Sequence, residues 1–198
     1  VERQTAHMAR MIEDLLDLTR IRSGTFTLRR ETVDLRVVFA KAVEMAQPLV
    51  ESRQQHLDVA EFADPLWVSG DPSRLVQVVS NILTNAAKFT QEGGHIWFTA
   101  AQDGETVTVR IRDNGVGIPK EMMSRVFELF GQVDPAVVTS AGGLGIGLYL
   151  VRRLVELHGG SVEAASDGSN KGSEFVVRLP LLSIGETAER SPPPAAGQ

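Results

Sequence analysis

Three polar residues share one face of a segment that otherwise has the pattern of a buried helix. Asn81, Asn85 and Lys88 lie at spacings of four and three residues, which puts their side chains on one side of a helix. Two amides and one cation suit a cluster of phosphate and magnesium, because hard cations prefer oxygen ligands. Taken alone, the three residues favour a plain solvated helix face.

Two glycine-rich stretches change that balance. "RDNGVGIP" (112–119) follows a predicted strand and contributes Asp113, and "AGGLGIGLYL" (141–150) opens a predicted helix. Glycine allows close backbone approach, and the start of a helix offers N–H groups to phosphate. The chain has no G-x-x-x-x-G-K-[ST], and the second stretch reads G-x-G-x-G rather than G-x-G-x-x-G. The two stretches therefore favour a phosphate site that is neither a P-loop nor a dinucleotide site.

The surrounding segments predict strands and helices that would position these residues. Asp71 followed by Pro72 is a typical helix start, so the helix with the three polar residues should run to about Lys88. The overall pattern predicts an α+β fold, a two-layer sandwich with a mixed, mostly antiparallel sheet and helices on one face. The other expected elements are a strand at 26–35 before a helix cap at Asp34, a helix at 36–55 with a local defect at Pro48, strands at 56–62 and 66–70, a hairpin about Asp103-Gly104, a short helix at 120–129, a helix ending at Gly159-Gly160, and a last hairpin.

The first 22 residues predict a helix of a different kind. Met8, Met11, Leu15 and Leu18 follow a coiled-coil spacing. One helix cannot bury its own apolar stripe. It is either a linker helix that packs on the domain or half of a helical hairpin in a dimeric bundle, and the second interpretation is favoured.

Composition sets the limits of these predictions. The net charge of −5 argues against a nucleic-acid binder, and the absence of cysteine excludes disulfides and thiolate metal sites. No run of about 18 apolar residues exists, and no signal peptide is visible. We expect a cytoplasmic segment of a longer protein, and any membrane anchor of the parent protein is expected outside this segment. Its expected parts are the end of a hairpin's second helix (1–24), a catalytic domain (25–182) and a flexible Pro/Ala/Gly-rich tail or linker (183–198).

The order of several motifs resembles a known family. "NILTNAAKFT", "DNGVGIP", "VFELFGQ", "GGLGIGLYLVRRLVELHGG" and "GSEFVVRLP" together look like the catalytic ATP-binding domain of sensor histidine kinases. That domain belongs to the superfamily of type II topoisomerases, heat-shock chaperones and mismatch-repair ATPases. The resemblance covers residues 31–182, and "IEDLLDLTRIRSG" resembles the end of the second helix of the dimerisation and phosphoacceptor hairpin.

The resemblance implies ATP and Mg²⁺ as cofactors and assigns roles to matching residues. Asn85 would hold Mg²⁺ with Asn81 beside it, and Lys88 would reach the phosphates. Asp113 would accept a hydrogen bond from the adenine amino group, since a carboxylate only accepts. The remaining implied residues are Gly115, Gly117 and Ile118 around adenine, Phe127 and Phe130 at a lid of about 120–142, Gly143, Leu144, Gly145 and Gly147 on the phosphates, and Gly172 and Ser173 at the far side. For the two phenylalanines, core packing is the plainer interpretation, and both roles can hold together.

Two features bear on what the protein does with bound ATP. Hydrolysing members of the superfamily typically place a glutamate base one turn before the magnesium asparagine, where this chain has Asn81. An amide cannot take a proton, so the resemblance favours phosphoryl transfer. Residues 126–151 contain no Lys or Arg, although family lids often carry a basic residue there. This keeps a nucleotide sensor without transfer activity as an alternative, beside an ATP-hydrolysing clamp and a serine kinase.

The acceptor histidine is expected outside this chain. None of His7, His56, His95 and His158 has the acidic and Pro-containing context of the family's acceptor. The chain should therefore bind Mg-ATP without phosphorylating itself. The implied partners are a phosphoacceptor hairpin of the same or a partner subunit and a response-regulator receiver domain. A homodimeric parent is expected, with no nucleic acid and no membrane contact from this segment.

Overall fold

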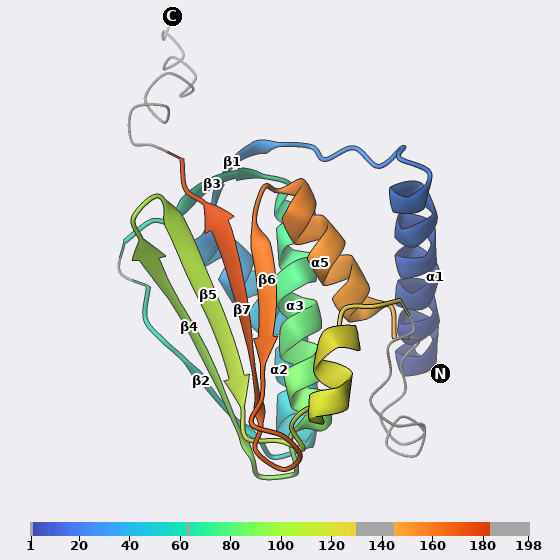
Figure 1. The fold of residues 1–198 in the computed structure, drawn as a ribbon, viewed down its shortest axis with the longest axis vertical. Coiled ribbons are helices and arrows are strands. Elements are labelled where there is room, and N and C mark those ends of the chain that lie inside the picture. The colour runs from blue at the N-terminus through green and yellow to red at the C-terminus, as the bar shows by residue number, and fades with distance from the viewer. Residues whose placement is uncertain (1, 63, 130–144, 183–198) are drawn as a thin grey trace, which may run out of the picture.

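The computed structural model describes residues 2–62, 64–129 and 145–182, with side chains from residue 11 onward. A five-stranded sheet carries helices on one face, and a further helix, α1, stands outside them (Figure 1). This arrangement confirms the predicted α+β sandwich. In chain order the elements are α1 (Glu2–Arg22), β1 (Glu31–Asp34), α2 (Leu35–Ser52), β2 (His56–Val59), β3 (Trp67–Gly70), α3 (Pro72–Phe89), β4 (His95–Asp103), β5 (Thr106–Asp113), the 3-10 helix η1 (Lys120–Arg125), α5 (Gly147–Leu157), β6 (Ser161–Ala165) and β7 (Ser173–Pro180).

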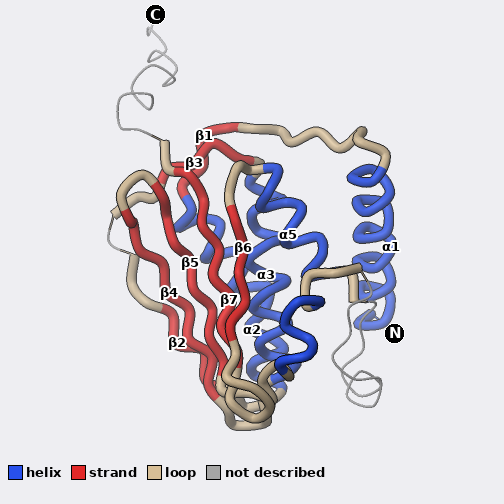
Figure 2. The backbone as a smooth tube through the Cα atoms, in the orientation of Figure 1, coloured by secondary structure: helices blue, strands red, loops and turns tan. Residues whose placement is uncertain are grey.

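The main sheet is mixed and mostly antiparallel, as predicted. Its strand order is β2-β4-β5-β7-β6, and only the β2–β4 pair is parallel (Figure 2). Asp103 faces Thr106 across the predicted hairpin turn. Strands β1 and β3 form a separate two-stranded sheet, with Thr32 opposite Ser69. Strand patterns alone did not distinguish this small sheet from the main one.

The helix starts follow local rules. The Asp71 carboxylate accepts hydrogen bonds from the backbone N–H groups of Ser73 and Arg74, at 3.1 and 3.3 Å, and so caps α3. Asp34 caps α2 in the same way, and α2 continues through Pro48. Two predicted boundaries were wrong. The strand before Asp34 begins only at Glu31, and the short helix after Pro119 is a 3-10 helix ending at Arg125.

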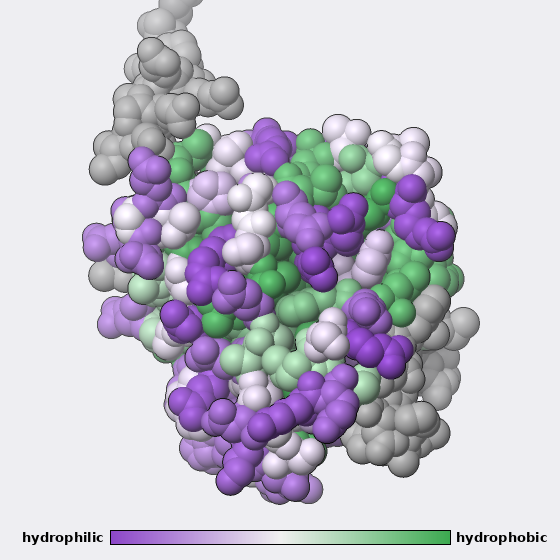
Figure 3. Space-filling model, in the orientation of Figure 1, coloured by the Kyte–Doolittle hydropathy of each residue, from purple (hydrophilic) through white to green (hydrophobic). Residues whose placement is uncertain are grey.

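The core lies between the sheet and helices α2, α3 and α5. On β5 the side chains alternate, with Val109 and Ile111 buried and Arg110 and Arg112 exposed. Phe39 of α2 meets Phe98 of β4 edge-on, with ring centroids 5.1 Å apart. Hydrophilic residues are spread over the side of the molecule seen in Figure 3, with hydrophobic residues between them. The helices thus cover one face of the sheet and leave its other face open.

Helix α1 packs on this domain through its last turns. Leu18 and Ile21 are buried against Ile146 and Leu150 at the start of α5. Farther toward its N-terminus, Leu15 is 41% exposed. Among the described side chains of α1, Leu18 and Ile21 thus make the buried apolar contact with the domain, and the place of the helix in a hairpin stays a prediction. In the part of the chain that the structure describes, no helix is long and apolar enough to cross a membrane.

Candidate functional site

A cavity of about 310 Å³ opens between α3, the end of β5 and the loop that joins β6 to β7. Most of its wall is apolar, and a small number of polar groups converge on it, which is the usual character of a small-molecule site. The polar lining residues are Asn85, Asp113, Ser169, Asn170 and Ser173. The remaining lining residues are Ala86, Phe89, Val116, Gly117, Ile118, Pro119, Val126, Leu148 and Phe175.

Asp113 is the buried carboxylate of this cavity. It ends β5 opposite Ser173 of β7, and only 3% of the residue is exposed. The Gly115 N–H donates to its Oδ1 at 2.8 Å, and the Ser173 hydroxyl donates to its Oδ2 at 2.6 Å. Burial raises the pKa of Asp113 above its ordinary value, although hydrogen bonds from Ser173 and Gly115 act to lower it. Each oxygen keeps acceptor capacity, so the carboxylate can take a donor from a ligand.

The turn after Asp113 requires glycine for steric reasons. A Cβ on Gly115 would lie 2.2 Å from the Phe89 carbonyl oxygen. Gly117 has φ +67°, and a Cβ there would lie 2.2 Å from the Gly168 carbonyl oxygen. These glycines let the turn pack against α3 and the β6–β7 loop.

The β6–β7 loop is hydrogen-bonded to the turn that follows Asp113. The Asn170 N–H donates to the Val116 carbonyl at 2.6 Å, and the Ile118 N–H donates to the Ser166 hydroxyl at 2.9 Å. Asn170 itself has a positive φ of 60°. Two loops distant in sequence therefore form one wall of the cavity.

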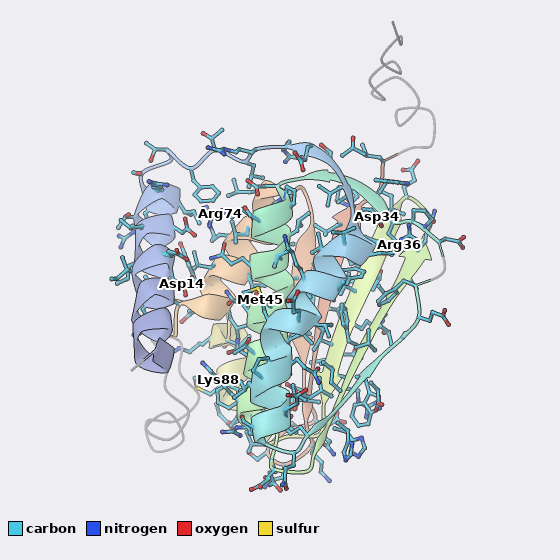
Figure 4. All side chains as sticks on the ribbon, turned by 180° about the vertical axis from the view of Figure 1, so that it is seen from behind. Asp14, Asp34, Arg36, Met45, Arg74 and Lys88 are labelled. Atoms are coloured by element: carbon cyan, nitrogen blue, oxygen red, sulfur yellow. The ribbon has the colours of Figure 1, made fainter. Side chains whose placement is uncertain are left out.

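The polar face of α3 is divided between two hollows. Asn85 lines the cavity, whereas Asn81 lines a wider hollow of about 870 Å³ between α1, α2 and α3. Figure 4 shows this helix side of the molecule. The Asn81 amide nitrogen is buried and has no hydrogen-bond partner among the described residues. A Cβ on Gly147 would lie 3.8 Å from it, so this amide borders the start of α5.

The structure therefore brings together part of the predicted set. Asn85, Asp113, Gly117, Ile118 and Ser173 line one cavity. Gly115 supports it from behind, while Lys88, half-buried in the last turn of α3, is not among its lining residues. Gly145 and Gly147 lie at the start of α5, and Gly172 contacts the Asp113 backbone. Phe130, Gly143, Leu144, most of the predicted lid and the tail from residue 183 lie outside the described residues.

Phe127 has a packing role that sequence reasoning allowed for. Its ring meets Phe175 edge-on, with centroids 6.2 Å apart. The core-packing interpretation of Phe127 is therefore confirmed. Whether it also anchors a lid stays a prediction.

Several lining residues were missed in the sequence. Phe89 directly follows Lys88, and Ser169 and Asn170 belong to the polar turn "SDGSNKGS" before the last strand. A turn of this composition predicts a loop, but nothing local indicates that the loop closes a cavity. Val126, Leu148 and Phe175 look like ordinary core residues in the sequence.

The donor set fits one particular way of holding magnesium. No group of three or more His, Cys, Asp or Glu side chains able to hold a metal occurs among the described residues. A site built from protein ligands alone is therefore absent from that part of the chain. The Asn85 amide oxygen at the cavity wall suits an ion that takes only one or two protein ligands and most of the rest from phosphate and water.

Comparisons with known proteins agree with this geometry. Residues 70–183 match the family model "Histidine kinase-, DNA gyrase B-, and HSP90-like ATPase". Sensor histidine kinase YclK of Bacillus subtilis (strain 168) is 36% identical over 91% of this chain and 38% of its own length. The crystal structure of full-length ShkA in complex with AMPPNP has a TM-score of 0.76 at 28% identity, over 90% of this chain and 36% of that one. The mycobacterial sensor histidine kinase MprB has a TM-score of 0.66 at 29% identity, over 78% of this chain and 99% of the solved one.

The chain spans only a part of its curated relatives. Its share of their length is 38% for YclK and 18% for sensor histidine kinase RcsC of Escherichia coli (strain K12), which is 35% identical over 88% of this chain.

Proposed function

This chain belongs to the histidine kinase-, DNA gyrase B- and HSP90-like ATPase family, in the form found in sensor histidine kinases, and from that premise we propose that it binds Mg-ATP and donates the γ-phosphate to a histidine on a hairpin domain. The observation that carries this proposal is the position of Asp113. A buried carboxylate at the wall of an otherwise apolar cavity can select a ligand that carries an amino group.

Adenine recognition would use a polar side and an apolar side of the cavity. The Asp113 carboxylate would accept from the 6-amino group, and guanine would present a carbonyl oxygen there instead. Ser173 and Gly115 hold the carboxylate in place through their hydrogen bonds. Ile118, Val126 and Phe175 would cover the ring faces and exclude water. The proposed selectivity for adenine therefore rests on one hydrogen-bond acceptor, the Asp113 carboxylate, in a cavity wall that is otherwise mostly apolar.

The phosphates would extend toward α3 and the start of α5. Asn85 would hold the magnesium ion, which neutralises phosphate charge when it is bound. Gly145 and Gly147 would offer backbone N–H groups. Asn81 carries no carboxylate that could take a proton from water, so positioning and charge neutralisation favour transfer over hydrolysis. The relatives named above are sensor kinases, which does not favour a hydrolysing clamp.

The acceptor and the partners follow from the same proposal. His158 is 3% exposed and lies between α3 and α5, so it is not available as an acceptor. The acceptor would lie on the first helix of a hairpin, in the same or a partner subunit of a homodimer. A response-regulator receiver domain would then take the phosphate. We infer a cytoplasmic location for these steps, because ATP is supplied there.

A binding and transfer assay tests the proposal. Isothermal titration should show Mg-dependent ATP binding to this chain, and Asn85→Ala should abolish the magnesium dependence. Thr84→Ala, one residue away on α3, is the matched control and should bind normally. With γ-labelled ATP, the chain alone should stay unlabelled, and a version extended upstream through the hairpin should gain acid-labile, base-stable phosphate. Binding without any transfer by the extended version would instead favour a nucleotide sensor.

A further inference from the structure

A buried carboxylate connects α1 to the ATP-binding domain. Asp17 of α1 lies in the contact between α1 and α3, and only 3% of this charged residue is exposed. It forms an ion pair with the Arg74 guanidinium in the first turn of α3. A buried carboxylate that loses such a partner keeps an uncompensated charge, which destabilises the folded protein. The contact between α1 and α3 therefore depends on Arg74.

Gln77 completes this pair one turn later on α3. Its side-chain nitrogen donates to Asp17 at 3.3 Å and to Asp14 at 3.2 Å, and its oxygen accepts from Arg74 at 2.9 Å. We call Asp14, Asp17, Arg74 and Gln77 the polar latch. Figure 4 labels Asp14 on α1 and Arg74 on α3, on the sides by which these helices face each other. Two residues on each helix thus fix one register between them.

Arg74 also contacts the segment that follows α1. Its guanidinium carbon lies 5.1 Å from the centre of the Phe26 ring, within the range of a cation–π contact. Phe26 in turn packs against the small apolar cluster between α1 and α5. One arginine therefore holds both the helix and the start of the linker.

The apolar part of the contact is small and lies close to the nucleotide site. Leu18 and Ile21 pack on Ile146 and Leu150, around the first turn of α5. Four buried side chains supply attachment with little directional preference, because hydrophobic contact is non-directional. Hydrogen-bonded charge pairs, by contrast, fix register and orientation more than they add stability.

We propose that the polar latch positions α1 on the ATP-binding domain, so that Arg74 acts as a positioning residue for phosphoryl transfer. This inference rests on the proposed function, because α1 would be part of the hairpin that carries the acceptor. With the latch formed, the hairpin stands at one angle to α3, the helix that carries Asn85. With the latch broken, nucleotide binding continues while the acceptor loses its place.

A distance measurement tests the latch without any enzyme assay. The chain contains no cysteine, so Arg20→Cys on α1 and Thr99→Cys on the open sheet face provide two unique sites for spin labels. Pulsed electron paramagnetic resonance should give one narrow distance distribution. Arg74→Met should broaden it, since Met keeps an unbranched apolar side chain and removes the charge and the N–H donors. The charge-reversed double variant Asp17→Arg/Arg74→Asp should narrow it again. The Gln77 amide has both a donor and an acceptor, so it can bond the arginine and the carboxylate after they exchange helices.

Arg36→Met is the matched control. Arg36 lies in the first turn of α2 and pairs with the cap residue Asp34 at 2.7 Å, and these two residues lie on α2 and β1 rather than on α1 (Figure 4). Its distance distribution should stay narrow. A narrow distribution in Arg74→Met, or equal broadening in Arg36→Met, would overturn the proposal.

Transfer kinetics of the version extended through the hairpin give the second readout. Arg74→Met should lower kcat about tenfold, because misplaced reacting groups lose much of their effective concentration. KM for ATP should stay within about twofold, since the latch does not line the cavity. Parallel loss of ATP affinity would reject a positioning role. If the unmodified protein binds ATP and transfers nothing, the proposed function fails, and the spin-label distances still decide the latch.

Discussion

Two buried aspartates at different places in the fold carry opposite electrostatic signatures. Asp113 and Asp71 are 3% and 7% exposed. Asp71 accepts from the Ser73 hydroxyl at 2.7 Å and from the N–H groups of Ser73, Arg74 and Arg29. Burial by itself raises the pKa of Asp71, but these hydrogen bonds and the nearby Arg74 charge lower it below its ordinary value. Burial prevails at Asp113, where fewer donors are present and the pKa is raised.

The difference separates a structural carboxylate from one that awaits a ligand. Asp71 caps α3 and ties the linker at Arg29 to it, so most of its acceptor sites are taken. Asp113 accepts hydrogen bonds from Gly115 and Ser173 and faces a cavity. Perturbed carboxyls in clefts are enriched at functional sites, whereas a saturated carboxylate stabilises the fold. Variants at either carboxylate should therefore have different effects, on ATP affinity at Asp113 and on stability at Asp71.

The largest expected effect comes from Asp113→Asn. An amide offers a donor where adenine also presents a donor. ATP affinity should fall about 10- to 100-fold, the range of a lost hydrogen bond to a charged group. Isothermal titration measures it, and thermal unfolding should show little change. Asp103→Asn, at the exposed end of β4, serves as the control. Unchanged ATP affinity in Asp113→Asn would reject the assignment of this site.

Asp71→Ala should act on stability instead. The variant loses the helix cap and the anchor for the Arg29 N–H, so the free energy of unfolding should fall by about 2 kcal/mol. Urea unfolding measures it. ATP affinity of the folded protein should stay within about twofold. Ser73→Ala removes only the hydroxyl bond and should cost less. A loss of affinity as large as that in Asp113→Asn would erase the distinction between the two carboxylates.

Ser173→Ala should have a smaller effect on the same cavity. It removes the 2.6 Å hydrogen bond to Asp113 and leaves the carboxylate in place. Loss of one such bond costs about 1 kcal/mol, which is roughly fivefold in ATP affinity. Ser173→Thr keeps the hydroxyl and should bind nearly normally. Equal affinities in the Ala variant and the unmodified protein would show that Asp113 is held well enough by Gly115.

The smallest expected effect is a difference in pH dependence. The pKa of Asp71 is lowered on folding, so its stabilising contribution is present above its unfolded pKa and is lost as pH falls through the folded value. The pKa of Asp113 is raised, so its ionisation destabilises the folded protein as pH rises through that value. Urea unfolding at several pH values measures the free energy of unfolding of each variant. Relative to the unmodified protein, Asp71→Asn should lose stability as pH rises, and Asp113→Asn should gain it. Deviations of the same sign would contradict the assigned shifts.

His158 shows how a residue identified by type can acquire an unforeseen role. Its position at a helix end predicts contact with the last carbonyls of that helix, and the Leu154 carbonyl does lie 2.7 Å from its Nδ1. The other ring nitrogen, Nε2, accepts from the Asp71 N–H at 3.0 Å. Burial lowers the pKa of His158, which keeps it neutral and able to accept. A chain separation of 87 residues hides this bond from local pattern.

The sequence by itself determined what depends on neighbours along the chain. Asp71 before Pro72 predicted the start of α3, and the Asp103-Gly104 turn predicted the β4–β5 hairpin, because caps and turns form from a few consecutive residues. The order of the motifs also predicted the family. Helical spacing put Asn81 and Asn85 on one face, as it must.

Tertiary structure decided which of those residues share a space. The packing of α1 and α2 around α3 sends Asn81 toward one hollow and Asn85 toward another. The close fit of the β6–β7 loop on the Gly117 turn adds Asn170 to the cavity. The choice of Asp17 as the partner of Arg74 likewise arises between residues 57 apart in the chain. Such contacts depend on how whole elements pack, and spacing within one element carries no record of that packing.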